Sequence, residues 1–343
     1  RTMTTMKYGL FVRSQYPEGD DMAVRFEELM VQARLAEKIG FSSILKGQHY
    51  AGHPLQELQQ VPFLARVMAE CPSLSLITGV VLLSLHKPLD IAEQLATLDI
   101  MSKGRLIFGA GLGYRDVELK AFGTNMAERA SRFEENLDAI IRLWTKPPVT
   151  MKGSHFELDN VTPSSRPVQK PRPPIWIGAN ADVAVERAAR LSDAWFINPH
   201  QRLDTIERQL DVYKRALDAA DKPFPDELPL MRELFVAPTR EEAKRLAQPY
   251  LEEKYKIYAQ WGQDKAMPDG DNDLSMTFDE LADGRFIFGS PDEVTEQIIR
   301  FNKTLGANHF VFSPHWVGMP NNLVLDMMNI MAEEVLPQVA QAL

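Results

Sequence analysis

The stretch from Thr97 to Gly123, TLDIMSKGRLIFGAGLGYRDVELKAFG, joins the end of a helix to a buried strand through a short turn. The Ser-Lys-Gly sequence at 102–104 supplies that turn, because glycine commonly ends a helix in the left-handed conformation. Residues 105–110 form an apolar run, which is typical of a parallel strand covered on both faces. Gly111 and Gly113 follow at the carboxyl end of this strand, where ligands bind in α/β folds.

Glycine occupies three alternate positions in this stretch, 109, 111 and 113. Side chains are therefore missing from one edge of the strand, and a flat ligand could lie against the bare backbone. The alternative is that glycine only eases packing where strands crowd together. The residues themselves leave both interpretations open.

Strands and helices alternate along the rest of the chain, so the fold class is α/β. Eight such units that cross over with the same hand predict a (β/α)8 TIM barrel, and 343 residues suit that fold. A doubly wound sheet is the alternative. Helices predicted between the strands include 55–70, 182–191 and 322–343. The predicted strands are 7–12, 41–46, 74–83, 105–110, 174–178, 194–198, 229–237 and 308–313.

No linker divides the chain, so residues 1–343 are predicted to form a single barrel domain. Insertions at the C-terminal face are expected near 145–174 and 262–290. The first is rich in proline and contains a predicted hairpin that turns at residues 152–153. The second includes the aspartate-rich segment 263–285, which is predicted to act as a lid over the site.

Composition excludes several classes of function. The formal net charge is −9 and no basic block occurs, so neither nucleic acid nor an anionic membrane surface is an expected partner. No apolar stretch approaches the ~18 residues of a membrane span. The single cysteine, Cys71, excludes a disulfide framework and suits the cytoplasm. Motifs for phosphate loops, zinc proteases and serine hydrolases are absent, so no metal site is predicted.

Polar and glycine residues cluster at the predicted strand ends. In a barrel the loops at these ends converge on one site. Each histidine, taken alone, is more often a core or surface residue, but several at strand ends together indicate a pocket. The residues are Gln48, His49, His53, Gly79, Val80, Gly111, Tyr114, His200 and His315.

A second candidate site is the turn GANAD at 178–182, between a strand and a helix. Small residues there expose N–H groups at a helix N-terminus, which suits a phosphate group. The alternative is a tight turn in which Asn180 or Asp182 merely caps the helix. Asp182 would repel a phosphate and is therefore expected to face away from it.

With these strands, glycines and turns identified, the chain resembles the bacterial luciferase-like monooxygenases, which are flavin-dependent (β/α)8 barrels. The resemblance covers nearly the whole chain and depends on the order and spacing of several segments. They are IGFSSILKGQHY, ITGVVLLSLHKPLDIAEQLATLDIMSKGRLIFGAGLGYRDVELKAFG, RFEENLDAIIRLW, PPIWIGANADVAVERAARLSDAWF and FGSPDEV.

The resemblance implies cofactor contacts at matching positions. Gly79 and Val80 occupy the place where family members often have a non-prolyl cis peptide against the flavin ring. The crest from Ala110 to Tyr114 would flank the flavin, and the GANA turn would hold its phosphate. The implied cofactor-binding residues are Gly79, Val80, Ala110, Gly111, Leu112, Tyr114, Gly178, Ala179, Asn180 and Ala181.

Three positions depart from luciferase itself. Gln48 stands where luciferase has its catalytic histidine, Gly111 where it has a reactive cysteine, and Leu112 where it has an arginine for the flavin phosphate. Light emission from an aldehyde is therefore not expected. The crest GAGLGYRDVE is closer to the FMN monooxygenases than to the branch that uses the deazaflavin F420.

The resemblance thus implies an FMN-dependent monooxygenase that receives FMNH2 from a separate NAD(P)H:flavin reductase and oxygenates a small organic substrate with O2. His49 would exchange protons near the flavin with Gln48 beside it, while His53 and His315 would contact substrate. Relatives of this kind often form homodimers. The alternatives are an F420-dependent oxidoreductase that transfers hydride, and a non-catalytic flavin- or ligand-binding barrel.

Overall fold

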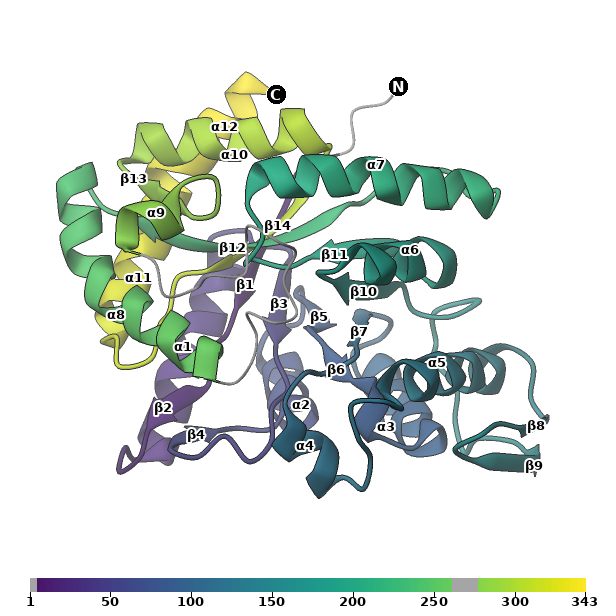
Figure 1. Cartoon of the computed structure of the whole chain (residues 1–343). Coiled ribbons are helices and arrows are strands. Elements are labelled where there is room, and N and C mark those ends of the chain that lie inside the picture. Colours follow the sequence, from purple (N-terminus) through teal and green to yellow (C-terminus); the bar gives the residue numbers. More distant parts are fainter. Residues whose placement is uncertain (1–4, 261–276) are drawn as a thin grey trace.

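Parallel strands close into a barrel in the computed structural model, which describes residues 5–260 and 277–343 (Figure 1). The ring runs β1–β3–β5–β7–β10–β11–β12–β14, and β14 pairs again with β1. The predicted TIM barrel is therefore confirmed, and the doubly wound sheet is excluded. The ring strands are β1 (Lys7–Phe11), β3 (Ser43–Lys46), β5 (Ser75–Thr78), β7 (Leu106–Gly111), β10 (Ile175–Ala179), β11 (Ala194–Ile197), β12 (Pro229–Val236) and β14 (His309–Ser313).

Successive strand residues point alternately into the barrel and out toward the helices. In β3, Leu45 belongs to the interior cluster with Trp176 and Met231, whereas Ile44 packs outward into the main core. Both faces of each strand are buried, which explains the nearly continuous apolar runs in the sequence.

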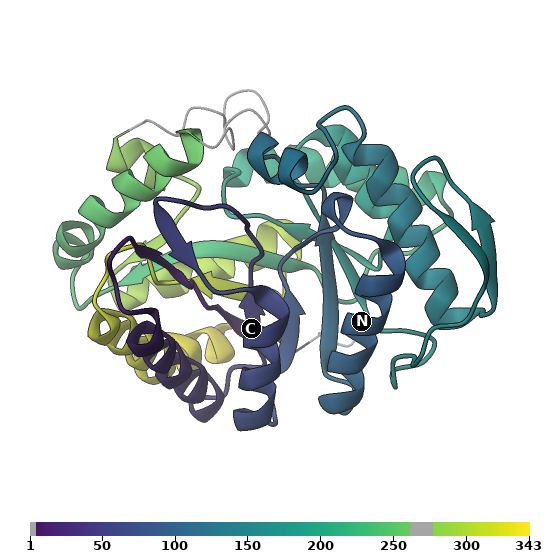
Figure 2. The same cartoon turned by 90° about the horizontal axis from the view of Figure 1, so that it is seen from below.

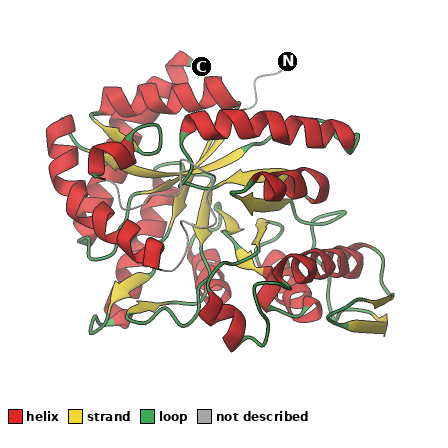
Figure 3. Cartoon of the chain, viewed as in Figure 1, coloured by secondary structure: helices red, strands yellow, loops and turns green. Residues whose placement is uncertain are grey.

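Helices surround the barrel on its outside (Figure 3). Asp21 caps the first of them by accepting hydrogen bonds from the amides of Ala23 and Val24. Within the described residues, no helix combines the length and apolar character that a membrane span requires. The principal helices are α1 (Met22–Lys38), α2 (Gln60–Glu70), α3 (Pro88–Met101), α5 (Arg129–Thr145), α6 (Asp182–Leu191), α7 (Leu203–Ala219), α8 (Arg240–Gln260), α10 (Pro291–Leu305), α11 (Asn321–Ile330) and α12 (Leu336–Ala342).

Three predicted elements were wrong in extent. Residues 55–57 form β4 (Leu55–Glu57), which pairs antiparallel with β2 (Gln15–Pro17), so the predicted helix 55–70 begins only at Gln60. The predicted strand 74–83 is divided into β5 and β6 (Val81–Leu82), and the peptide bond between Gly79 and Val80 is cis. The last helix is divided by a π-helical segment, η3 (Met331–Val335).

The predicted insertion near 145–174 contains the expected hairpin. Its strands are β8 (Val149–Lys152) and β9 (Glu157–Val161), which lie at the edge of the molecule (Figure 2). In the region near 262–290, residues 277–290 include α9 (Phe278–Ala282) and β13 (Ile287–Gly289), and β13 pairs with β12. The remainder of that insertion, with most of the predicted lid, lies outside the described residues.

A chain of polar side chains closes the floor of the barrel, at the amino ends of the strands. Ser43 Oγ lies 2.7 Å from His309 Nε2, and His309 Nδ1 lies in hydrogen-bond contact with the carboxylate of Glu227. Ser43 and His309 are fully buried. Burial raises the pKa of Glu227, but the hydrogen bond and charge of His309 outweigh this and leave the pKa below its ordinary value of 4.5.

We expect Glu227→Gln to lower the free energy of unfolding by about 1–2 kcal/mol at neutral pH, because it removes a charged hydrogen bond. A carboxylate whose pKa is depressed in the folded state stabilises the protein above its unfolded pKa and loses that effect as the pH falls through the folded pKa. The difference from wild type should therefore shrink below pH 4.5. Urea unfolding across this pH range measures it, with Asp226→Asn as the control, and a difference independent of pH would contradict the assignment.

Candidate functional site

A cavity of about 350 Å³ opens among the loops that follow the carboxyl ends of the barrel strands. This is the end at which the strand-end residues were predicted to converge. Of the residues predicted for the site, the cavity is lined by Gln48, His49, Gly79, Val80, Gly111, Leu112, Tyr114, Gly178, Ala179, Asn180, Ala181 and His200.

Gly109 and Gly111 make room for neighbouring atoms. A Cβ at Gly109 would lie 2.0 Å from the backbone oxygen of Thr78, and one at Gly111 would lie 2.6 Å from a methyl group of Val80. At these two positions the structure therefore favours the interpretation that glycine allows close packing, rather than the one in which a ligand lies against bare backbone. It is the side chain of Val80, admitted by Gly111, that faces the cavity here.

The turn before α6 forms one end of the cavity. The first N–H groups of a helix lack intrahelical acceptors, and this end of α6 is bordered by the lining residues Asn180 and Ala181. Asp182 is held by two hydrogen bonds from Arg208 of α7, which lower the pKa of its carboxyl. Among the described residues, no group donates to the buried Oδ1 of Asn180.

Arg129, at the start of α5, also lines this end of the cavity and was not predicted. Its guanidinium donates to the carbonyl of Gly113 at 2.7 Å and so connects the helix to the crest. Burial lowers the pKa of Arg129, and the positive charge of Arg187 acts in the same direction. A bound anion would offset both effects. The helix end and Arg129 together therefore fit a phosphate group.

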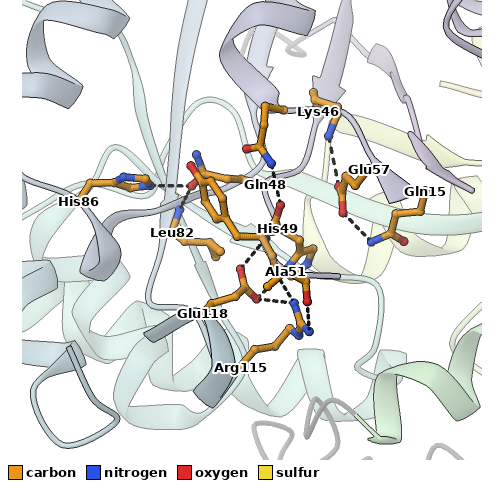
Figure 4. Close-up of polar contacts among 12 residues, drawn as sticks. Gln15, Lys46, Gln48, His49, Ala51, Glu57, Leu82, His86, Arg115 and Glu118 are labelled. Carbon is orange, nitrogen blue, oxygen red and sulfur yellow. Dashed lines mark hydrogen bonds and ion pairs between the residues drawn. The ribbon is translucent and has the colours of Figure 1, made fainter. Parts of the chain in front are cut away.

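His49 is anchored by a buried carboxylate (Figure 4). Its Nδ1 lies 3.2 Å from Oε1 of Glu118, which is 2% exposed and comes from the short helix α4 (Asp116–Ala121). Because a carboxylate only accepts hydrogen bonds, Nδ1 carries the proton in this contact. Glu118 also pairs with Arg115 at 3.2 Å and accepts from the amide of Tyr50. The orientation of the imidazole ring is thus fixed from outside the cavity.

We expect Glu118→Ala to lower the free energy of unfolding by about 3 kcal/mol, because the buried guanidinium of Arg115 loses its carboxylate partner. Asp116→Ala is the matched control on the same helix: its ion pair with Lys120 is exposed and screened by solvent, so its loss should change the stability much less. Denaturant unfolding of both variants measures the difference. Equal losses would show that the buried pair is not stabilising.

Gln48 is held by two hydrogen-bond donors. Its Oε1 lies 2.8 Å from the amide nitrogen of Leu82 and 3.0 Å from Nε2 of His86 (Figure 4). Burial lowers the pKa of His86 to about 4, so its ring is neutral at physiological pH. Neither contact could be predicted, since residues 48, 82 and 86 are far apart in the sequence.

The remaining wall is charged. Lys46 is 1% exposed, and its ammonium group contacts the carbonyl of Gly47 at 2.9 Å and Glu57 at 3.3 Å. Gln15 donates to the same carboxylate (Figure 4). It also accepts a hydrogen bond from Arg13. Burial lowers the pKa of Lys46, and Glu57 acts in the opposite direction. The sequence signal for this wall is a lysine at the end of the apolar run SILK, and this lysine was not predicted as a site residue.

Three predicted site residues do not line the cavity. His53 is an exposed side chain that pairs with Glu18 at 3.5 Å. His315 is fully buried, and burial together with Arg13 lowers its pKa to about 3. Ala110 is buried within β7. In the part of the chain that the structure describes, no group of three or more histidine, cysteine, aspartate or glutamate side chains is arranged to hold a metal ion.

Comparison with known proteins matches this geometry to one family. A family model described as luciferase-like monooxygenase matches residues 6–309. The solved structure of the monooxygenase RslO1 from Streptomyces bottropensis superposes with a TM-score of 0.84 at 26% identity, over 97% of this chain and 99% of that one.

Two curated relatives differ in the cofactor that their names state. The F420-dependent glucose-6-phosphate dehydrogenase of Amycolatopsis mediterranei is 26% identical over 91% of this chain and 94% of its own length. The oxygenase component of flavin-dependent trigonelline monooxygenase from Acinetobacter baylyi is 22% identical, over 98% of this chain and 96% of its own.

Proposed function

Because the chain belongs to the luciferase-like monooxygenase family, we propose that it is an FMN-dependent monooxygenase that oxygenates a small organic substrate with O2. The observation that carries the proposal is the shape of one cavity. It joins an apolar wall at Val80 to an anion site at Arg129 and the start of α6. A planar ring with a phosphate on a flexible chain requires an apolar wall and an anion site in the same cavity.

The residues present fit FMN. The phosphate would be held by Arg129 and the first turn of α6, and the unpartnered Oδ1 of Asn180 offers an acceptor to a hydroxyl of the ribityl chain. Val80, Leu82 and Phe196 supply apolar contact for a ring and exclude water from it. When bound, reduced FMN would supply the electrons that activate O2.

His49 is the group proposed to move a proton. Glu118 orients the ring through Nδ1, and the ring lines the cavity, where it would exchange a proton with a ligand. Gln48, the second residue proposed to act near the reaction, has no titratable group and contributes a polar contact. His200 lines the same cavity and would contact the substrate in this proposal.

Reduced flavin must be supplied from outside, so we propose a separate NAD(P)H:flavin reductase as the functional partner. The relative from Acinetobacter baylyi is likewise named as the oxygenase component of a larger system. A single barrel that acts as a homodimer in the cytoplasm remains the working proposal for its organisation.

F420-dependent hydride transfer is the second candidate, and the relative from Amycolatopsis mediterranei favours it. The experiment is an anaerobic titration of the purified protein with FMN, FMNH2 and F420, followed by admission of O2 to the FMNH2 complex. We expect FMNH2 to bind, and its oxidation to proceed at a rate different from that of free FMNH2. Binding of F420 alone would favour the second candidate, and binding of none of them would favour a non-catalytic barrel.

A further inference from the structure

The side-chain amide of Gln48 has only one orientation in its surroundings. The N–H of Leu82 is a donor, so the Gln48 atom that lies 2.8 Å from it is the oxygen. His86 Nε2 lies 3.0 Å from the same oxygen and must therefore carry a hydrogen. These two donors fix the amide about its last torsion angle, and the NH2 group points away from both.

The NH2 group of Gln48 is accessible from the cavity. Gln48 lines that cavity, and among the described residues no group accepts a hydrogen bond from its nitrogen. The nitrogen is not fully buried either, because it is absent from the fully buried side-chain atoms without a hydrogen-bond partner. The NH2 group of Gln48, at the edge of a largely apolar wall, is therefore available to donate a hydrogen bond to a ligand. This donor carries no charge and does not titrate.

We propose that the Gln48 amide is a fixed hydrogen-bond donor for a carbonyl oxygen of the bound ligand, and that His86 is the positioning residue that holds it. The inference rests on the proposed function, in which the carbonyl belongs either to the flavin ring or to a ketone or aldehyde substrate. A neutral amide favours a neutral acceptor, because it offers no charge to a carboxylate or sulfonate.

His86 is suited to this role by its surroundings. Its ring packs against Tyr50 and Phe122, with centroids 6.0 and 5.6 Å away, so it cannot swing out of contact. Its backbone carbonyl accepts from Asn136 of α5 at 3.0 Å. A neutral imidazole with its hydrogen on Nε2 donates to Gln48 continuously, and the low pKa near 4 is consistent with this state.

The test compares Gln48→Leu with wild type, using two probes. The first is the carbonyl stretching bands of bound oxidised FMN in infrared difference spectra, since a hydrogen bond lowers the frequency of the carbonyl that accepts it. The second is the affinity of the FMN-loaded protein for cyclohexanone and for methylenecyclohexane, which has the same shape and no acceptor. In wild type, we expect one of two results. Either a carbonyl band of bound FMN has a lower frequency than in free FMN, or cyclohexanone binds threefold to tenfold more tightly than methylenecyclohexane.

Gln48→Leu should abolish whichever signal is present, which identifies flavin or substrate as the source of the carbonyl. The positioning role of His86 is tested with a matched pair. His86→Gln keeps a nitrogen donor near the position of Nε2 and should retain the signal, whereas His86→Leu should weaken it. A merely structural role for His86 predicts equal effects of both variants.

The outcomes are distinguishable. If wild type binds FMN and neither signal differs between wild type and Gln48→Leu, the donor role of Gln48 is wrong and the proposed function stands. If wild type binds no FMN, the proposed function fails first. Circular dichroism of each variant establishes that a lost signal does not come from a lost fold.

Discussion

Gly109→Ala is expected to prevent the barrel from closing. The added Cβ would lie 2.0 Å from the backbone oxygen of Thr78 on the neighbouring strand β5. Because the obstacle is backbone, no side chain can rotate away to relieve the contact. The strands are also joined there by hydrogen bonds between Thr78 Oγ1 and the backbone of Gly109, both of 2.9 Å. A loss of about 4 kcal/mol or more is expected, which is exceptional for one methyl group.

The matched control for this prediction is Gly47→Ala. A Cβ at Gly47 would meet its nearest neighbour at 3.6 Å, which is an ordinary contact distance. This variant should therefore change the free energy of unfolding by less than about 1 kcal/mol. Thermal and urea unfolding, followed by circular dichroism, compare the two. A Gly109→Ala protein as stable as Gly47→Ala would show that the two strands can separate at no cost.

Arg129→Ala is expected to weaken FMN binding by about tenfold to a hundredfold, because it removes a charged contact to the phosphate. Riboflavin lacks that phosphate, and its affinity should change by less than about threefold if the lost interaction is with the phosphate alone. Fluorescence titration of both flavins measures the two effects separately. Their ratio, rather than either affinity, reports the role of Arg129.

Arg132→Ala is the control on the same helix. Arg132 pairs with Glu128 at 3.0 Å and is not part of the cavity wall. It should leave both affinities unchanged. If Arg129→Ala lowers the affinities for FMN and riboflavin equally, the phosphate site lies elsewhere. The effect would then come from the contact between Arg129 and Gly113, which holds the crest in place.

Much of the fold was accessible from the sequence because it depends on local patterns. Short strands alternate with amphipathic helices, and α6 was predicted with its observed limits, residues 182–191. The error at residues 55–57 has a long-range cause. This segment pairs with β2, about forty residues earlier in the chain, and helical periodicity contains no information about such a partner.

The candidate site was predictable in part for the same reason. Residues of the strand-end loops, such as Gln48 and His49, follow from the topology of a barrel. The side chains that hold them do not follow from the topology, because Glu118 and His86 come from two separate segments between strands. The charged wall of Lys46 and Glu57 was missed because its pairing becomes evident only when β4 is recognised as a strand.

The floor of the barrel carries a further consequence. Ser43, His309 and Glu227 occur in the order of nucleophile, base and orienting acid that serine hydrolases use. Yet the hydroxyl belongs to a side chain with no exposed surface, and the ring of Trp176 packs edge-on against the imidazole at 5.2 Å. An ester has no route to this serine. The three side chains that cleave bonds in the cleft of a hydrolase here form a buried hydrogen-bonded link between β3, β14 and the segment that precedes β12.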